Sequence, residues 1–225
     1  MRTVIVSGGT GALGVAVTTT LLESDWRVIV PHSRPGGLER LEPNGNLVLV
    51  EADLFDQSAA EEVVARAGAN LAALVNLVGG FNSGGRVNET PIDDFEAQFR
   101  LNLRPTYLLC HAAIPVLLEH GAGSIVCVST RAALRPFAGA AGYISSKAAI
   151  LSLVDVLATE YTRDGLRANA ILPSVIDTPA NRVHLPNEDH SRWVKPEEIA
   201  RVIRFLISED STPTSGAHIP VYGRA

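Results

Sequence analysis

Two side chains four residues apart could carry acid–base chemistry. Tyr143 and Lys147 fall in segment 142–163, which has the apolar pattern of a long helix, and the chain has only two lysines. Residues i and i+4 of an α-helix lie on the same face, so the ammonium would stand close to the phenol. A nearby positive charge lowers the pKa of a tyrosine from its usual value of about 10. The spacing therefore predicts a phenol that can donate and accept a proton near neutral pH.

A glycine-rich turn follows the first expected strand, residues 3–6. Its sequence is Ser-Gly-Gly-Thr-Gly-Ala-Leu-Gly, with glycines at 8, 11 and 14. Gly8 would permit the tight turn, a small residue at position 11 or 12 would let the backbone approach a pyrophosphate, and Gly14 would let the next helix pack on the sheet. A tight turn alone would also explain the glycines. Between a strand and a helix N-terminus, however, they favour a dinucleotide-binding site.

The end of the second expected strand bears on the choice of cofactor. A dinucleotide fold often has an acid about 20 residues beyond the glycines, where it binds the adenosine ribose hydroxyls. Here the sequence is Pro31-His32-Ser33-Arg34, with no acid. The Ser33 hydroxyl and the Arg34 guanidinium suit a 2′-phosphate instead, which favours NADP(H) over NAD(H). The alternative is that Arg34 is a solvated loop residue.

The elements that must position these residues alternate along the whole chain. Strands that are apolar on both faces and alternate with helices predict a parallel sheet covered on both sides. We therefore expect an α/β, Rossmann-type fold with a doubly wound parallel sheet of about seven strands in three layers, forming a single domain over residues 1–225. The expected strands are 3–6, 27–30, 46–51, 71–77, 124–128, 166–172 and 217–221, and the main expected helices are 12–23, 57–67, 92–119, 142–163 and 196–207.

Composition excludes several classes of protein. A hydrophobic content of 46% with 19% charged residues suits a globular chain, and the net charge of −5 argues against broad binding of nucleic acid. Cys110 and Cys127 fall in apolar segments and are expected to be buried free thiols. No cluster of His, Cys, Asp or Glu has metal-ligand spacing, so we expect no metal. We find no room for a signal peptide and no apolar run near the ~20 residues that span a bilayer, and expect a cytoplasmic protein.

Taken together, these motifs resemble the short-chain dehydrogenase/reductase family in its compact single-domain form. The resemblance covers nearly the whole chain. The sequence Tyr-Ile-Ser-Ser-Lys at 143–147 resembles the family's active-site motif, and Asn102 lies where the family has a catalytic asparagine. The position 13 residues before Tyr143, normally serine, holds Thr130. Ser129 precedes it, but adjacent side chains on a strand point to opposite faces, so Thr130 is the better candidate.

The resemblance implies hydride transfer between a nicotinamide and a small carbonyl or alcohol substrate. Tyr143 would be the general acid/base, Thr130 would hydrogen-bond the substrate oxygen, and Lys147 would lower the tyrosine pKa and bind the nicotinamide ribose. The chain departs from the family at Ala12, where the middle glycine would stand, and at Leu77-Val78 within the Asn-Asn-Ala-Gly segment. With Ser33 and Arg34, the expected cofactor-binding residues are Gly8, Thr10, Gly11, Leu13, Gly14, Asp53, Leu54, Asn76, Gly79, Tyr143, Lys147, Pro173, Val175, Ile176 and Thr178.

A proline gives Asn102 a structural setting of its own. Pro105 cannot donate a hydrogen bond to the carbonyl of Leu101, so helix 92–119 is expected to kink there. The freed carbonyl and the Asn102 amide could hold a water that connects Lys147 to solvent, consistent with the family's proton relay. At the start of the same helix, Thr90 is expected to act as a hydroxyl cap.

The substrate site and the assembly are less well defined by the sequence. Segments 80–86 and 181–193 are the expected walls, with Phe81, Phe137 and Trp193 as candidates for an apolar surface. Apolar residues over more than one face of helices 92–119 and 142–163 predict pairing with another copy, and the family resemblance implies a homotetramer or dimer.

Two other functions were weighed against this one. An NADP-binding sensor or regulatory protein with little or no turnover would keep the same fold, and Thr130 in place of serine is its best support. A sugar-nucleotide epimerase has similar glycine spacing, but this chain lacks the length of that substrate domain.

Overall fold

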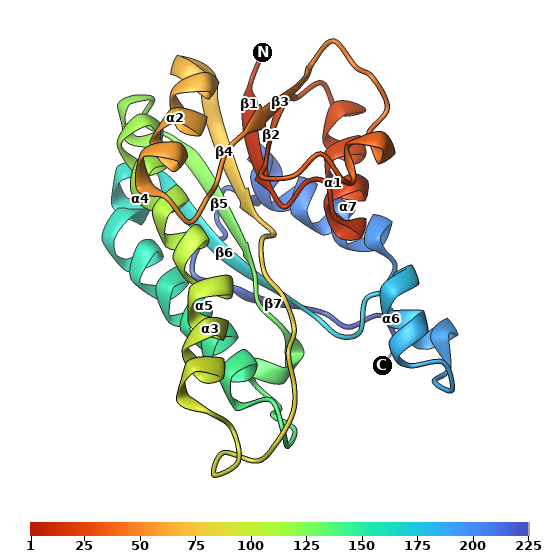
Figure 1. The fold of residues 1–225 in the computed structure, drawn as a ribbon. Coiled ribbons are helices and arrows are strands. Elements are labelled where there is room, and N and C mark those ends of the chain that lie inside the picture. The colour runs from red at the N-terminus through yellow and green to blue at the C-terminus, as the bar shows by residue number, and fades with distance from the viewer. Residues whose placement is uncertain (225) are drawn as a thin grey trace.

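Seven strands form one parallel sheet in the order β3-β2-β1-β4-β5-β6-β7 (Figure 1). The structure is a computed structural model that describes residues 1–224. The strands are β1 (Thr3–Ser7), β2 (Arg27–His32), β3 (Leu47–Glu51), β4 (Leu71–Asn76), β5 (Gly123–Val128), β6 (Leu166–Pro173) and β7 (His218–Val221). This is the predicted doubly wound Rossmann-type sheet.

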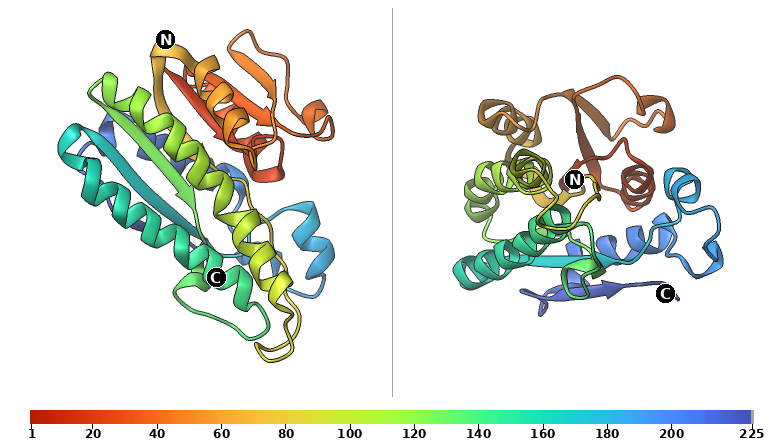
Figure 2. Two further views of the ribbon diagram at one scale, coloured as in Figure 1. Left: turned by 60° about the vertical axis from the view of Figure 1, so that its left-hand side comes forward. Right: turned by 60° about the horizontal axis from the view of Figure 1, so that its bottom comes forward.

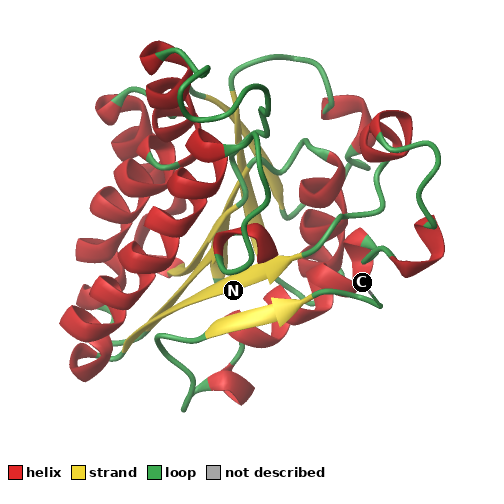
Figure 3. Cartoon of the chain, turned by 90° about the horizontal axis from the view of Figure 1, so that it is seen from below, coloured by secondary structure: helices red, strands yellow, loops and turns green. Residues whose placement is uncertain are grey.

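Helices cover both faces of the sheet, which gives the three layers seen in Figures 2 and 3. Helices α2, α4 and α5 pack on one face, with α3 against α5, whereas α1 and α7 pack on the other. Their bounds are α1 (Ala12–Leu22), α2 (Gln57–Ala67), α3 (Ile92–Asn102), α4 (Arg104–Glu119), α5 (Ala141–Tyr161), α6 (Pro179–His184) and α7 (Pro196–Ile207). Short 3-10 helices are η1 (Leu38–Arg40), η2 (Gly68–Asn70), η3 (Arg131–Ala133), η4 (Thr162–Asp164), η5 (His190–Arg192) and η6 (Glu209–Ser211).

Alternation along each strand divides the buried side chains between two hydrophobic cores. On β1, Ile5 belongs to the core beneath α2, α4 and α5, while Val4 and Val6 belong to the core beneath α1 and α7. All three are fully buried. A strand with no polar face can be stable only between two helical layers, which explains the continuous apolar runs in the sequence.

The glycine turn has the tight geometry that the sequence predicted. Gly8 has a φ of +71°, in the left-handed region that favours glycine. At Gly14, a Cβ atom would lie only 2.0 Å from the carbonyl oxygen of Gly8, so no side chain fits where α1 meets the turn. Gly11 is the N-cap of α1 and is exposed, which leaves its backbone open to a ligand.

The expected long helix 92–119 is divided at Leu103. Helix α3 ends at Asn102 and α4 begins at Arg104, because Pro105 in the first turn of α4 cannot continue the hydrogen-bond ladder. The predicted kink is therefore confirmed. The expected cap at Thr90 is wrong: Pro91 is the N-cap of α3, and the Thr90 hydroxyl donates to the carbonyls of Gly85 and Arg86 instead.

Helix α5 is more apolar than the sequence reading allowed. Residues 141–164, which include α5 and the turn after it, are long and apolar enough to cross a membrane by length and composition. In the fold, however, α5 buries Ile150, Leu151, Val154 and Leu157 in the core shared with α2 and α4. Its apolar character is thus used in packing against the sheet.

Candidate active site

The residues that could take part in catalysis or cofactor binding lie at the carboxyl ends of the strands. The chain order reverses between β1 and β4, which are neighbours in the sheet, and ligands of open α/β sheets bind at such a switch point. The glycine turn after β1 and the loops after β2, β4, β5 and β6 all leave the sheet at this edge (Figure 1). The sheet topology therefore brings together segments that lie far apart in the sequence.

Tyr143 and Thr130 meet at this edge. Tyr143 lies in the first turn of α5, Thr130 lies just beyond β5, and the Thr130 hydroxyl is near enough to the phenol to influence its pKa. The neighbouring Ser129 is buried, and its Oγ donates to the carbonyl of Lys147 at 2.7 Å. The strand alternation thus directs Thr130, rather than Ser129, towards the tyrosine, as predicted.

Lys147 is buried one turn further along α5. Its Nζ donates to the carbonyl oxygen of Val128 at 3.0 Å. Burial penalises the ammonium and lowers the pKa of Lys147 to about 8, while the nearby Cys127 thiol opposes that shift. The side chain is therefore a cation at neutral pH, held close to the end of β5.

The expected acidification of Tyr143 does not appear in this arrangement. Burial raises the pKa of Tyr143 above its ordinary value, because it penalises the phenolate, and the nearby Thr130 hydroxyl opposes this only in part. The Lys147 ammonium is instead directed at the Val128 carbonyl. The i and i+4 positions on one helix therefore did not predict where the ammonium points.

Asn102 joins α3 to β4 and α5. Its Oδ1 accepts from the N–H of Gly80 at 2.9 Å, and its Nδ2 donates to the Ser146 Oγ at 3.0 Å. Ser146 in turn donates to the carbonyl of Tyr143 at 2.8 Å. Both ends of the amide thus have one protein partner, which leaves one N–H and one lone pair for the expected relay water, and that water stays a prediction. The sequence reading missed Ser146, although it lies inside the recognised motif.

Gly79 fits directly against this network. A Cβ atom at position 79 would lie 2.6 Å from the Asn102 Oδ1 and 2.9 Å from the Lys147 Nζ. The loop after β4 therefore passes close to the side chains of both Asn102 and Lys147. Gly79 shapes the site through its lack of a side chain.

The loop after β2 packs against the glycine turn. A Cβ atom on Gly37 would lie 2.9 Å from the Thr10 carbonyl oxygen. Ser33 and Arg34 are exposed in this loop. His32 lies on the same side of β2 as Val30, which contacts Gly9, and its Nδ1 is buried without a hydrogen-bond partner in the described chain. An unpartnered buried nitrogen beside Ser33 and Arg34 fits a site for an added polar group, and sequence reasoning passed over it.

Two of the expected cofactor-binding residues after β3 and at the end of β4 have buried side chains, whereas a third is exposed. The Leu54 side chain is buried in the core, which leaves only its backbone available. Asn76 is also buried, since its Oδ1 accepts from Ser7 and its Nδ2 contacts the sulfur atoms of Cys110 and Cys127 at 3.5 and 3.7 Å. Asp53 remains exposed at the sheet edge, and one carboxylate oxygen accepts from the N–H of Phe55.

The segment after β6 is held at the same edge. Val175 and Asp177 form backbone hydrogen bonds with Val194, and Ile176 bridges to the same residue. Pro173 is buried at the end of β6, and the Thr178 Oγ1 accepts from the N–H of Asn181 as the cap of α6. These residues border the site as a fixed strip, and the Thr178 O–H remains able to donate to a ligand.

Both cysteines are free and buried, as predicted. The Cys127 pKa is lowered by a hydrogen bond from Cys110, and the Cys110 pKa is raised for the complementary reason, together with burial. Within residues 1–224, no group of three or more His, Cys, Asp or Glu side chains is placed to hold a metal ion.

Comparison with known proteins decides the family. Residues 10–223 match a family model described as enoyl-(acyl carrier protein) reductase, one of the short-chain dehydrogenases/reductases. The chain belongs to the short-chain dehydrogenase/reductase family. It is thus an NAD(P)-dependent oxidoreductase, and the resemblance inferred from the motifs is confirmed.

Individual relatives of this short-chain dehydrogenase/reductase span nearly its whole length. It is 29% identical to 2-(R)-hydroxypropyl-CoM dehydrogenase of Xanthobacter autotrophicus, over 99% of this chain and 97% of the relative. It is 35% identical to the protein FixR of Bradyrhizobium diazoefficiens, over 99% and 86%. The solved structure of ElxO with NADP bound has the same fold, with a TM-score of 0.91, 23% identity and coverage of 99% and 97%.

The first testable prediction concerns Lys147. Because the chain has only two lysines, protein labelled with ¹³C-lysine should give two side-chain signals, of which Lys195→Arg removes one. The remaining signal should titrate with a midpoint near pH 8, since burial disfavours the ammonium. The folded state then binds fewer protons than the unfolded state between about pH 8 and 10.5, so this residue makes the free energy of unfolding rise with pH there. A midpoint above about 10 would contradict the described environment.

Proposed function

We propose that this oxidoreductase uses NADPH to reduce a small carbonyl compound, or the reverse, with Tyr143 as general acid/base. The observation that carries the proposal is the neighbouring pair of hydroxyls of Tyr143 and Thr130, with Lys147 one helical turn further along α5. Two hydroxyls and a cation at the switch point of the sheet are what reduction of a carbonyl requires: a proton, a second donor to the oxygen and a positive charge.

The protein's task is to hold the substrate and manage one proton. The nicotinamide supplies or accepts the hydride at the carbonyl carbon. During reduction, the Tyr143 hydroxyl gives its proton to the developing alkoxide, and the Thr130 hydroxyl donates a hydrogen bond to the same oxygen. Lys147 binds the nicotinamide ribose. Asn102 and Ser146 fix the backbone at Tyr143 and so set the direction of the phenol.

The Tyr143 hydroxyl is available as a proton donor at neutral pH. An unperturbed phenol, with a pKa of about 10, is already protonated there, and burial raises the pKa of Tyr143 further.

The second prediction tests the proton donor. Tyr143→Phe should lower kcat for NADPH-dependent reduction of a ketone panel by about 10²–10⁴-fold, because it removes the general acid. Thr130→Ser keeps the hydroxyl, removes one methyl group and should retain turnover. Nicotinamide absorbance gives both rates.

Unchanged turnover in Tyr143→Phe would contradict the proposed mechanism. Tight NADPH binding with no turnover, and no gain from Thr130→Ser, would support a sensor or regulatory protein instead. The observation that favours a sensor or regulatory function is Thr130, which occupies the position normally held by serine.

For the cofactor, we propose NADP(H) over NAD(H). The support is the set of side chains beyond β2: the exposed Arg34 and Ser33, and the unpartnered His32 Nδ1. The contact of Gly37 with Thr10 holds their loop beside the turn that would receive the pyrophosphate. A guanidinium and a hydroxyl suit the additional phosphate of NADP, whereas an acid would be needed to bind the free ribose hydroxyls of NAD.

The third prediction tests this preference. Arg34→Ala should lower kcat/KM for NADPH by about 10- to 100-fold, since a charge-assisted hydrogen bond is lost, and should change kcat/KM for NADH by less than about twofold. Arg40→Ala is the matched control, because Arg40 is also exposed but pairs with Glu39. Equal losses with both cofactors would count against a 2′-phosphate site.

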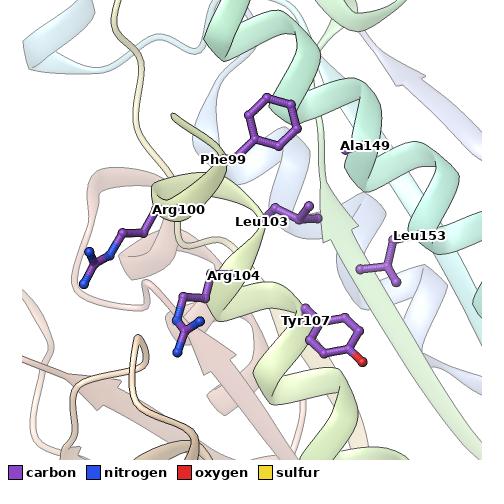
Figure 4. A pocket seen from close by; sticks show the side chains of 7 residues that line it. All are labelled: Phe99, Arg100, Leu103, Arg104, Tyr107, Ala149 and Leu153. Atoms are coloured by element: carbon purple, nitrogen blue, oxygen red, sulfur yellow. The ribbon is translucent and has the colours of Figure 1, made fainter. Parts of the chain in front are cut away.

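We also propose that the chain forms a homo-oligomer through the outer face of α3, α4 and α5. This face carries a depression of about 660 Å³ between the helices (Figure 4). Tyr107 there is 53% exposed, and apolar rings and chains stand beside two arginines. The lining residues are Phe99, Arg100, Leu103, Arg104, Tyr107, Ala149 and Leu153. Such a mixed apolar and cationic face is suited to a two-fold contact with a second copy.

The fourth prediction tests the assembly. Leu153→Glu would bury a carboxylate in the proposed contact, so it should convert the oligomer to a monomer in light scattering after gel filtration. Leu49→Glu introduces the same charge at an exposed position of β3 and should leave the mass unchanged. A monomeric wild-type protein would overturn the proposal directly.

We further propose that the protein acts in the cytoplasm on small carbonyl or alcohol substrates. We propose that it binds neither nucleic acid nor a membrane. The net charge of −5 supports this, because broad binding to nucleic acid needs a basic surface.

A further inference from the structure

Two exposed phenylalanines stand beside the catalytic tyrosine. The Phe81 ring meets the Tyr143 ring edge to face, with centroids 4.9 Å apart and an interplanar angle of 87°. The Phe137 ring lies 6.4 Å from Phe81 at 48°. Phe81 is 60% exposed and Phe137 is 50% exposed. The rings of Phe137, Phe81 and Tyr143 thus form one continuous aromatic group.

The backbone fixes both phenylalanines relative to the site. Phe81 directly follows Gly80, whose N–H donates to the Asn102 Oδ1. The loops that carry the two rings lie side by side at the lower end of the molecule in Figure 1 and in the left view of Figure 2. A hydrogen bond of 2.7 Å from the N–H of Gly84 to the carbonyl of Gly139 joins them. The rings therefore occupy defined positions and are not side chains of two unconnected loops.

Their exposure is informative because of where it occurs. A single exposed apolar side chain is ordinary, but neighbouring aromatic rings at the point of reaction leave a large apolar area in water. A bound ligand that covers the rings removes this apolar area from water, which stabilises the complex. Trp193, the third aromatic candidate, is buried and packs on His190 instead. The exposed aromatic rings beside Tyr143 thus come from the loops after β4 and β5.

We infer that the site takes a carbonyl or alcohol compound with an aromatic ring next to the reacting carbon. This inference rests on the proposed function and names its substrate class. The substrate ring lies against Phe81 and Phe137, while its oxygen reaches the hydroxyls of Tyr143 and Thr130. The reaction leaves the ring unchanged: in reduction the carbonyl carbon gains a hydride from the nicotinamide, and the oxygen gains the Tyr143 proton.

Ring geometry favours an aromatic over a merely apolar substrate. Edge-to-face and offset contacts between rings add stabilisation beyond the area they bury, and Phe81 already makes such a contact with Tyr143. A saturated ring of equal size buries similar area without this additional attraction. A preference for an aromatic substrate over a saturated one of equal size is therefore the expected result if the site recognises aromatic rings.

The test compares benzaldehyde with cyclohexanecarboxaldehyde, which matches it in size. The wild-type enzyme with NADPH should show a kcat/KM about threefold to tenfold higher for the aromatic aldehyde. Phe81→Ala and Phe137→Ala should each bring this ratio close to one. Phe81→Tyr keeps a ring and should retain the preference. Phe205→Ala, which removes an exposed ring on α7, is the matched control and should leave the ratio unchanged.

A second readout keeps this inference separate from the proposed function. Saturation-transfer NMR with benzyl alcohol and cyclohexylmethanol, in the presence of NADP, measures binding without turnover. Stronger transfer to the aromatic ring that is lost in Phe81→Ala would support the inference even if no carbonyl were reduced, in which case only the proposed function fails. Equal kcat/KM for the two aldehydes, or a preference that survives both alanine variants, would overturn the inference while leaving the proposed reaction intact.

Discussion

The close approach of the β4 end to Asn102 and Lys147 is the constraint on which the site depends. A side chain at Gly79 would require the Asn102 amide or the Lys147 ammonium to move, because a Cβ there would lie 2.6 Å and 2.9 Å from these groups. The next N–H, from Gly80, is bound by the same amide oxygen. Through Ser146, this contact continues to the backbone of Tyr143. One short segment after a central strand thus sets the relative positions of α3 and α5.

Much of the fold followed from simple patterns in the sequence. Strands apolar on both faces specified a parallel sheet between helical layers, and two helices, residues 57–67 and 196–207, have the predicted bounds. The division at Leu103 followed from one proline. Strand alternation also selected Thr130 over Ser129. These predictions succeeded because each depends on local periodicity or on a backbone property of one residue.

Other features depend on contacts between distant segments, which local patterns do not contain. The sequence placed Lys147 near Tyr143 but not its hydrogen bond to Val128, which is a matter of side-chain direction. The Asn76 amide was expected at the cofactor, yet it lies in a buried group with Ser7 and the two thiols. Likewise, the meeting of Phe81 with Phe137 results from the folding of two loops about 50 residues apart in the chain.

The contact between Gly37 and Thr10 has a consequence for ligand recognition as a whole. Because the loop beyond β2 rests on the turn beyond β1, neither can be displaced without disturbing the other. A ligand that ordered the turn would therefore also restrict the loop that carries Ser33 and Arg34. Under the proposed cofactor assignment, the diphosphate and the adenosine end of one dinucleotide would then bind with positive coupling.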